Sequence, residues 1–360
     1  MISSVTTSLP TQSKRIVRWM RNAILIFLVL AVVLAIAGAC YESIERAAGR
    51  RRFPQEGRAI DVGGYRLNLN CTGHGSPTVV LDSGLGGYST SWRIVQADIS
   101  KVTRICSYDR AGYGWSDAGP LPRTSAQIAR ELHTLLQKGG ELPPYIMVGH
   151  SLGGYNIRVY NGLFPGEVAG MVLVDASQED QSASASPRLK QAQEAAIRSA
   201  QEKPFFEPLL LRLGIARLMA PSIFAQSGIP KAQIEESIYL DLQPKYAETR
   251  RAEFASLAES ANQTRAAGKL DDMPLIVLTA GKLTVDESKL PAGITRQDLE
   301  DFHKQWVDDL QVREAHLSTR GKQIVVPDSG HQIDLERPDA VISAIREVYA
   351  DVNSGAVLKH

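Results

Sequence analysis

The sequence predicts an α/β fold with a mostly parallel sheet, preceded by one transmembrane helix. Short apolar runs typical of buried strands alternate with helical segments along most of the 360-residue chain. One of these runs, Tyr145–Val148, leads without a spacer into Gly-His-Ser-Leu-Gly, and a helical segment, Tyr155–Leu163, follows. Near the amino end, residues 23–40 contain no charged side chain.

Composition indicates a globular protein and gives no reason to expect a nucleic-acid partner. The chain has 40 Lys and Arg against 39 Asp and Glu, a net charge of +1 at pH 7. Such a balance lacks the basic surplus that attracts nucleic acids. The length allows one large or two ordinary domains. The sequence shows neither a metal-ligand cluster nor a dinucleotide fingerprint, so we expect no cofactor.

The amino-terminal segment predicts a membrane anchor. The uncharged run at 23–40 has 18 residues, near the lower limit for a helix that spans a bilayer. We expect residues 1–22 to form a basic tail, 23–40 a transmembrane signal anchor and 41–55 a charged linker. A cleaved signal peptide is the alternative, and Ala37–Cys40 also loosely resembles a lipoprotein cleavage box. The basic residues before the run are Lys14, Arg15, Arg18 and Arg21.

Eight segments have the apolar or alternating pattern of strands. The first two meet at Gly63-Gly64, which predicts a hairpin. A helix is expected behind Thr124, because Thr124 and Gln127 have the spacing of a capping box. The eight segments are Arg58–Val62, Tyr65–Cys71, Thr78–Asp82, Thr103–Tyr108, Tyr145–Val148, Val168–Asp175, Pro274–Thr279 and Gln323–Val326.

Ser151 is the predicted nucleophile. It stands in a G-x-S-x-G pattern between a strand and a helix, which is the context that gives this pattern meaning. The turn forces Ser151 into a strained backbone conformation, and the glycines Gly149 and Gly153 allow strand and helix to approach closely. The hydroxyl would then be exposed at a helix N-terminus, which favours negative charge. The alternative is a tight glycine-rich turn without a catalytic role.

A second glycine-rich turn, Ser83–Gly87, follows the strand that ends at Asp82. Its backbone can approach a ligand closely, so it could form the first half of an oxyanion hole. We expect the N–H groups of Leu85 and Leu152 to be the two donors. The alternative is a plain turn before a helix.

Four motifs together resemble the α/β-hydrolase superfamily over about residues 58–350. The resemblance implies an eight-stranded, mostly parallel sheet and a Ser…acid…His triad. We therefore expect a hydrolase domain at 56–352 with a helical cap at 178–272. One departure is that Asp82-Ser83-Gly84 stands where the family usually has His-Gly before the oxyanion glycines. The motifs, in family order, are Asp82–Gly87, Tyr108–Ser116, Gly149–Gly154 and Ser329–His331.

His331 is the expected general base. It follows the strand Gln323–Val326, and loops at the carboxyl ends of parallel strands carry the active sites of α/β proteins. Its expected role is to take the Ser151 proton and later return it to the leaving group. His150, although next to the nucleophile, is expected to point away from it.

Two aspartates compete for the role of the acid. The superfamily's acid usually follows the strand Pro274–Thr279, commonly a few residues past a glycine, and Asp286 stands rather far from Gly281. The superfamily also accepts an acid one strand earlier, where Asp175 lies. We favour Asp175, which would otherwise only cap the following loop.

The expected cap contains an apolar island, Pro204–Ile215, that could line an acyl or alcohol pocket or face the membrane. The family's strand order makes the strands of Cys71 and Cys106 neighbours, so a disulfide is expected between them. Two buried thiols are the alternative. A disulfide requires an oxidising compartment, so we expect the catalytic domain outside the cytoplasm.

The sequence thus predicts a serine hydrolase that cleaves small-molecule or lipid-like carboxylic esters through an acyl-enzyme. Amide, thioester or lactone hydrolysis on the same triad is an alternative, because the triad alone does not choose among them. A membrane-tethered binding module without catalytic activity is the alternative from a different class.

Overall fold

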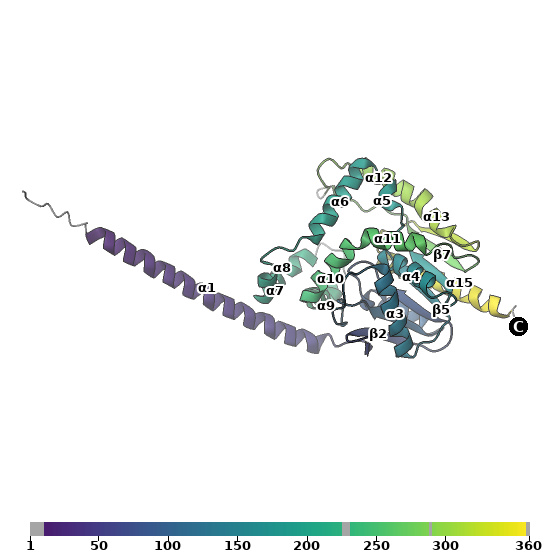
Figure 1. Cartoon of the computed structure of the whole chain (residues 1–360), viewed down its shortest axis with the longest axis horizontal. Helices are drawn as coiled ribbons and strands as arrows, with labels where there is room; N and C mark the ends of the chain where they lie inside the picture. The colour runs from purple at the N-terminus through teal and green to yellow at the C-terminus, as the bar shows by residue number, and fades with distance from the viewer. Residues whose placement is uncertain (1–10, 225–230, 288–289, 358–360) are drawn as a thin grey trace, which may run out of the picture. The chain divides into compact units, whose positions relative to one another are not determined.

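The computed structural model describes residues 11–224, 231–287 and 290–357 (Figure 1). The chain divides into two units. The amino-terminal unit is Met1–Pro54 with Pro204–Leu242, and the sheet unit is Gln55–Lys203 with Gln243–His360. Residues 1–10 of the expected basic tail and 225–230 of the expected cap lie outside the described residues.

An eight-stranded sheet organises the sheet unit, and all eight predicted strands are present. The strand order is β1-β2-β4-β3-β5-β6-β7-β8. The pairs β1–β2 and β2–β4 are antiparallel, and all the other pairs are parallel. The predicted mostly parallel sheet is therefore confirmed. The strands are β1 Arg58–Asp61, β2 Arg66–Thr72, β3 Thr78–Asp82, β4 Ile105–Asp109, β5 Tyr145–His150, β6 Val168–Val174, β7 Leu275–Ala280 and β8 Gly321–Val326.

Two apolar cores lie on the two faces of this sheet. In β5, Tyr145 and Met147 enter the core that also contains buried side chains of helices α3 and α4. Ile146 and Val148 point to the other face and pack with residues of α2 and α15. Because strand side chains alternate between faces, a strand buried on both sides must be apolar throughout. Each such side chain contributes about 1.5–3 kcal/mol relative to exposure.

Helices flank the sheet on both faces, and the predicted cap of α3 is confirmed in part. The Thr124 hydroxyl accepts a hydrogen bond from the Gln127 N–H at 3.3 Å, while the Gln127 side chain donates to Glu131 instead of returning to the cap. The helices of the sheet unit are η1 Ser89–Trp92, α2 Arg93–Ile99, α3 Ser125–Gly139, α4 Leu152–Leu163, α5 Gln181–Ser184, α6 Pro187–Gln201, α10 Pro244–Ala255, α11 Leu257–Ala266, α12 Arg296–Gln305, η3 Trp306–Leu310, α13 Gln311–Ala315, α14 Ile333–Glu336 and α15 Pro338–Val357.

The amino-terminal unit is helical and contains α1 Thr11–Arg52, α7 Glu207–Arg212, α8 Ile215–Phe224 and α9 Lys231–Asp241. Helix α1 is long and apolar enough to be a membrane span or a signal sequence. Residues 41–52, expected to be part of a linker, continue this helix without a break. The central part of the expected cap, residues 204–242, belongs with α1, whereas its flanks belong to the sheet unit.

Cys71 and Cys106 form a disulfide, with their Cα atoms 4.0 Å apart. They lie directly opposite each other in the antiparallel β2–β4 pair. The bond joins two residues that are 35 positions apart in the sequence. Replacing both cysteines by alanine should lower the free energy of unfolding by about 2–4 kcal/mol, because the unfolded chain regains loop entropy. Denaturant titration measures this loss. Non-reducing mass spectrometry that finds two free thiols in native material would contradict the bond.

Candidate active site

The turn between β5 and α4 holds Ser151 in a strained conformation with a positive φ, at φ 52° and ψ −119°. A Cβ on Gly153 would lie 2.3 Å from the carbonyl oxygen of Asp82, so this close approach requires glycine. The Ser151 carbonyl accepts hydrogen bonds from the N–H groups of Gly154 and Ser177, both at 3.0 Å. The strained serine is thus fixed at the start of α4, where the first N–H groups of a helix favour negative charge.

His331 and Asp175 meet at this same edge of the sheet. The His331 Nδ1 lies 2.6 Å from the Asp175 Oδ2. The other carboxylate oxygen, Oδ1, accepts hydrogen bonds from the Ala280 N–H at 2.9 Å and from the Trp306 Nε1–H at 2.8 Å. The Asp175 side chain is 5% exposed and that of His331 is 49% exposed. Asp175 also has a positive φ of 41°, so two of the predicted residues have strained backbones.

Burial and hydrogen bonding shift the pKa values of His331 and Asp175 in opposite directions. Burial disfavours the imidazolium, but the hydrogen bond and charge of Asp175 outweigh burial and raise the pKa of His331. Burial likewise disfavours the Asp175 carboxylate, yet its bonds to His331, Ala280 and Trp306 lower the pKa of Asp175. The aspartate therefore stays charged and holds Nδ1 as the protonated nitrogen, which leaves Nε2 to accept a proton.

These shifts predict a pH profile. Only the neutral imidazole can act as a base, so kcat/KM should rise as pH increases through the pKa of His331 in the free enzyme. Because Asp175 raises that pKa, the acid limb should lie above the value of about 6.5 for an ordinary imidazole. In Asp175→Asn the limb should move to lower pH. Initial rates between pH 5 and 9 test this, and a limb that does not move in Asp175→Asn would contradict it.

A cavity of about 380 Å³ brings the predicted site residues together. Ser151, His331, Leu85 and Leu152 all line it, whereas Asp175 lies behind His331. Apolar side chains from α10 and α11 complete part of the wall. The other lining residues are Gly84, Gly87, Ser91, His150, Ser177, Gln181, Arg250, Phe254, Leu257, Gln332 and Asp334.

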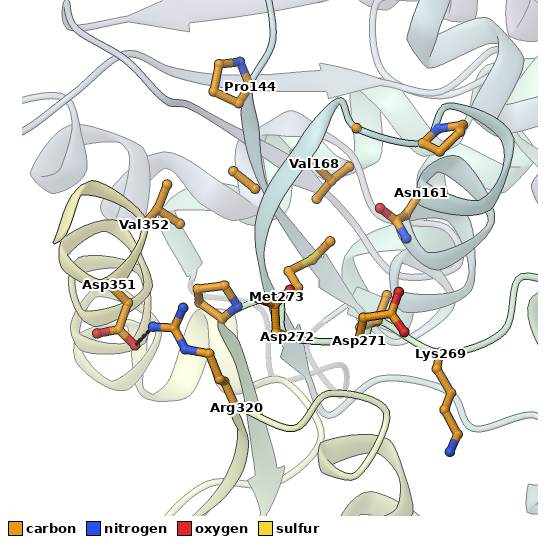
Figure 2. Close-up of a pocket in the computed structure, with 15 residues that line it drawn as sticks. Pro144, Asn161, Val168, Lys269, Asp271, Asp272, Met273, Arg320, Asp351 and Val352 are labelled. Carbon is orange, nitrogen blue, oxygen red and sulfur yellow. Dashed lines mark ion pairs between the residues drawn. The ribbon is translucent and has the colours of Figure 1, made fainter. Parts of the chain in front are cut away.

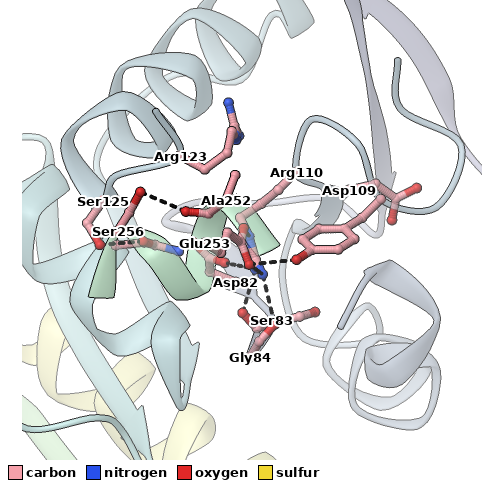
Figure 3. A network of polar contacts seen from close by, with 12 residues as sticks. Asp82, Ser83, Gly84, Asp109, Arg110, Arg123, Ser125, Ala252, Glu253 and Ser256 are labelled. Atoms are coloured by element: carbon pink, nitrogen blue, oxygen red, sulfur yellow. Dashed lines mark hydrogen bonds and ion pairs between the residues drawn. The ribbon is translucent and has the colours of Figure 1, made fainter. Parts of the chain in front are cut away.

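A buried charge network supports the turn expected to supply the oxyanion hole (Figure 3). Arg110 is 2% exposed and donates to the carbonyl oxygens of Ser83 at 2.6 Å and Gly84 at 2.8 Å. It also binds Asp82 at 2.9 Å and Glu253 of α10 at 2.8 Å. Buried charges are stable only when paired and hydrogen-bonded. Arg110 thus fixes the backbone of the turn and ties it to the helix that lines the cavity.

Arg110→Lys should leave a folded enzyme with about 10- to 100-fold lower kcat, because a lysine lacks the fork that holds two carbonyls and two carboxylates together. Loss of turn geometry affects stabilisation of the transition state more than ground-state binding, so KM should change less than kcat. Steady-state kinetics on samples with matched melting curves tests this. An unchanged kcat in folded Arg110→Lys would remove Arg110 as a positioning residue.

The structure distinguishes the two candidate acids and corrects the prediction for His150. Asp286 is exposed and follows β7, whereas the carboxylate that lies 2.6 Å from the His331 Nδ1 is that of Asp175. The prediction that His150 points away from the site is wrong. Its ring centroid lies 4.8 Å from that of His331, and its Nε2 is 2.9 Å from the His331 carbonyl oxygen. His150 is the last residue of buried β5, and it lines the same cavity as Ser151.

Sequence reasoning missed Trp306 and Glu253. Trp306 begins a short π-helix, a rare local structure that is often found at functional sites. No local pattern in the sequence marks this π-helix, so its contact with Asp175 had no available signal. Glu253 lies 143 residues from Arg110 and looks like an ordinary polar helix position. The Asp109-Arg110 motif was visible, but its buried partner was not.

Within the described residues, two further features, a larger cavity and a cluster of possible metal-ligand atoms, do not provide an alternative catalytic site. A cavity of about 590 Å³ lies at the opposite edge of the sheet, where Pro144 and Val168 stand at the amino ends of strands (Figure 2). Active sites of parallel α/β sheets lie at the carboxyl ends instead. Cys71, Cys106 and Glu141 place ligand atoms within 4.8 Å of one another, but the two sulfurs are bonded to each other and offer no thiolate.

Comparison with known proteins agrees with this architecture. Residues 77–204 match the alpha/beta hydrolase fold family. An AB hydrolase superfamily protein of Gibberella zeae is 22% identical over 293 residues, which cover 76% of this chain and 86% of that protein. The protein named "Probable transporter efuK" of Hormonema carpetanum is 26% identical over 326 residues, 83% of this chain and 44% of that protein. The chain spans 44% and 46% of the first two curated relatives that it matches.

Among solved structures, a thermophilic esterase from Thermogutta terrifontis aligns with a TM-score of 0.53 at 22% sequence identity. The alignment covers 82% of this chain and 97% of the esterase. At this level of identity the similarity shows a shared fold, and the chemistry has to be argued from the site.

Proposed function

The chain belongs to the alpha/beta hydrolase superfamily, a family of hydrolases, and we propose on this premise that it is a serine hydrolase of carboxylic esters. Ser151, Asp175 and His331 would be its triad. One observation carries the proposal. The strained Ser151 and the His331 imidazole line one cavity, and the Nδ1 of that imidazole is 2.6 Å from a buried carboxylate. A nucleophile, a base and an orienting acid are the parts that acyl transfer needs.

In the first half-reaction the Ser151 Oγ attacks the ester carbonyl carbon while the His331 Nε2 takes the Oγ proton. The carbonyl electron pair moves to its oxygen, and the N–H groups of Leu85 and Leu152 stabilise that oxyanion. The tetrahedral intermediate collapses, the carbon–alkoxide bond breaks, and the imidazolium gives its proton to the leaving alcohol. Asp175 remains a carboxylate and stabilises the imidazolium.

In the second half-reaction a water molecule takes the place of the alcohol. His331 removes one of its protons as the oxygen attacks the acyl-enzyme, and the same proton returns to the Ser151 Oγ when the acid leaves. No electrons are gained or lost overall, so the route needs nothing beyond ester and water.

Esters are favoured within the acyl-transfer class by the lining of the cavity. Apolar side chains line part of the wall, notably Phe254 of α10 and Leu257 of α11, which suits an acyl chain. The proposed substrate is a small or lipid-like carboxylic ester.

We also propose that α1 anchors the enzyme in a membrane and that the sheet unit lies outside the cytoplasm. The uncharged run within α1 supports the anchor. The Cys71–Cys106 disulfide supports an oxidising compartment.

The test is turnover of p-nitrophenyl esters, from acetate to long acyl chains, by the full chain in mild detergent. The proposal predicts turnover with an optimum chain length. No turnover on any ester, with Ser151 still labelled by a fluorophosphonate, would reassign the triad to amides, thioesters or lactones. A folded sample that shows no turnover and no labelling would favour the alternative of a non-catalytic binding module.

A further inference from the structure

One face of α1 is built to contact α7, α8 and α9. Gly38, Glu42, Glu45 and Gly49 follow one another at intervals of four, three and four residues, which places them on one side of the helix. A Cβ on Gly38 would lie 2.5 Å from the carbonyl oxygen of Leu213, and a Cβ on Gly49 would lie 2.4 Å from the Tyr239 ring. Both glycines therefore permit contacts that a larger residue would prevent.

Between these glycines, a buried ion pair joins α8 to α1. The Arg217 guanidinium contacts both Glu42 carboxylate oxygens, at 2.8 and 3.0 Å, and both side chains are largely buried. Arg46 adds a contact to the same carboxylate at 2.6 Å. Bidentate pairs of this kind fix orientation as well as proximity. The position of α7 and α8 along α1 is thus determined.

Helices α7 and α8 and the residues just before them expose large apolar side chains. Phe205 is 100% exposed, and Leu218 is 67% exposed. Soluble surfaces rarely gather so many apolar side chains over so short a segment unless something covers them. We call this set the apolar surface. Its members are Phe205, Phe206, Leu209, Ile215, Leu218 and Met219.

The contact between α7 and α1 indicates that lipid covers the apolar surface. Gly38 lies inside the uncharged run 23–40, and the turn between α7 and α8 rests directly against it at Leu213. If that run crosses a bilayer, the apolar surface is held at the depth of the run's last turn. By contrast, Gly49 lies 11 residues further on, about 16 Å along the helix, beyond the hydrocarbon.

We propose that α7 and α8 form an interfacial surface that rests in the outer part of the lipid bilayer. The inference depends on the proposed membrane anchor, not on the proposed chemistry. Arg212 is exposed on α7, and an arginine at this depth favours lipid headgroups while its apolar neighbours enter the acyl region. The surface would add a second attachment to the bilayer beside the span.

The test measures depth at four sites of the full chain in phosphatidylcholine vesicles. In a Cys40→Ser background, single cysteines replace Leu218, Met219, Leu30 or Arg51 and carry an environment-sensitive fluorophore. Lipids with a quencher near the headgroup or deep in the acyl chain report depth. Leu30 is exposed near the middle of the run, and Arg51 lies near the charged end of α1. They are the membrane and aqueous controls.

The proposal predicts that headgroup-level quenching at Leu218 and Met219 exceeds that at Arg51 by at least about threefold, with deep quenching strongest at Leu30. If the label at Leu30 is quenched but the labels at Leu218 and Met219 are quenched no more than the label at Arg51, the interfacial surface is overturned. If the labels at Leu218 and Met219 instead quench each other between molecules, a second copy of the chain covers the surface. No quenching at Leu30 would overturn the anchor and the surface together. Ester turnover in the same vesicles reports the proposed chemistry separately.

Discussion

Replacing Ser151 by alanine should lower kcat for a p-nitrophenyl ester by about a million-fold. The substitution removes the Oγ that is proposed to form the acyl-enzyme, and alanine offers no nucleophile in its place. What remains is the stabilisation that the oxyanion hole and substrate binding supply without a nucleophile. Stopped assays over days, with active enzyme excluded by separate columns, can measure a loss of this size.

The control for this variant is Ser177→Ala. Ser177 lines the same cavity, and its N–H rather than its hydroxyl contacts Ser151. Its loss should cost less than about tenfold, because no bond of the reaction passes through its side chain. Both variants should show the melting temperature of the parent within error. A folded Ser151→Ala variant that keeps a tenth of the parental rate would end the serine hydrolase interpretation.

The second large effect is expected at Asp175. Asp175→Asn keeps the shape of the side chain but removes the charge that stabilises the imidazolium and selects the tautomer of His331. An amide that turns its NH₂ toward Nδ1 would favour the wrong tautomer, so kcat should fall about 10⁴-fold. The fall should come with the downward shift of the acid limb described above. Steady-state kinetics across pH measures both.

Asp286→Asn is the matched variant on the competing aspartate. Asp286 is exposed, so we expect kcat to change by less than about threefold. Both variants convert a carboxylate into an amide, so they differ only in the position of the residue. A larger loss in Asp286→Asn than in Asp175→Asn would reassign the acid to the later strand.

Local patterns were sufficient where the fold depends on local residues. The eight strands were predictable because each buried strand is an apolar run bounded by turn residues, as in β5. The tight turn at Ser151 was predictable because such a turn requires glycines at fixed offsets. The proposed acid was harder to choose, since Asp175 and Asp286 both follow strands. Only the three-dimensional structure brings Asp175 to 2.6 Å from the His331 Nδ1.

The features that could not be predicted from the sequence depend on contacts between residues far apart in the chain. Trp306 reaches Asp175 across 131 residues, and its π-helix has no sequence signature. The charges at 41–52 suggested a linker, but Glu42 and Arg46 pair within the helix, and Arg217 completes the pair from a distant segment. The grouping of α7–α9 with α1 rather than with the sheet unit follows from these contacts, and the apolar island that begins at Pro204 did not by itself predict this grouping.

The measurement closest to the central claim is the site of covalent modification by a fluorophosphonate. The full chain is treated with the reagent, digested, and mapped by tandem mass spectrometry. The account predicts one adduct, on Ser151, formed faster as pH rises through the pKa of His331 and absent in a heat-denatured sample. An adduct on another residue, or no adduct in folded protein that binds esters, would contradict it.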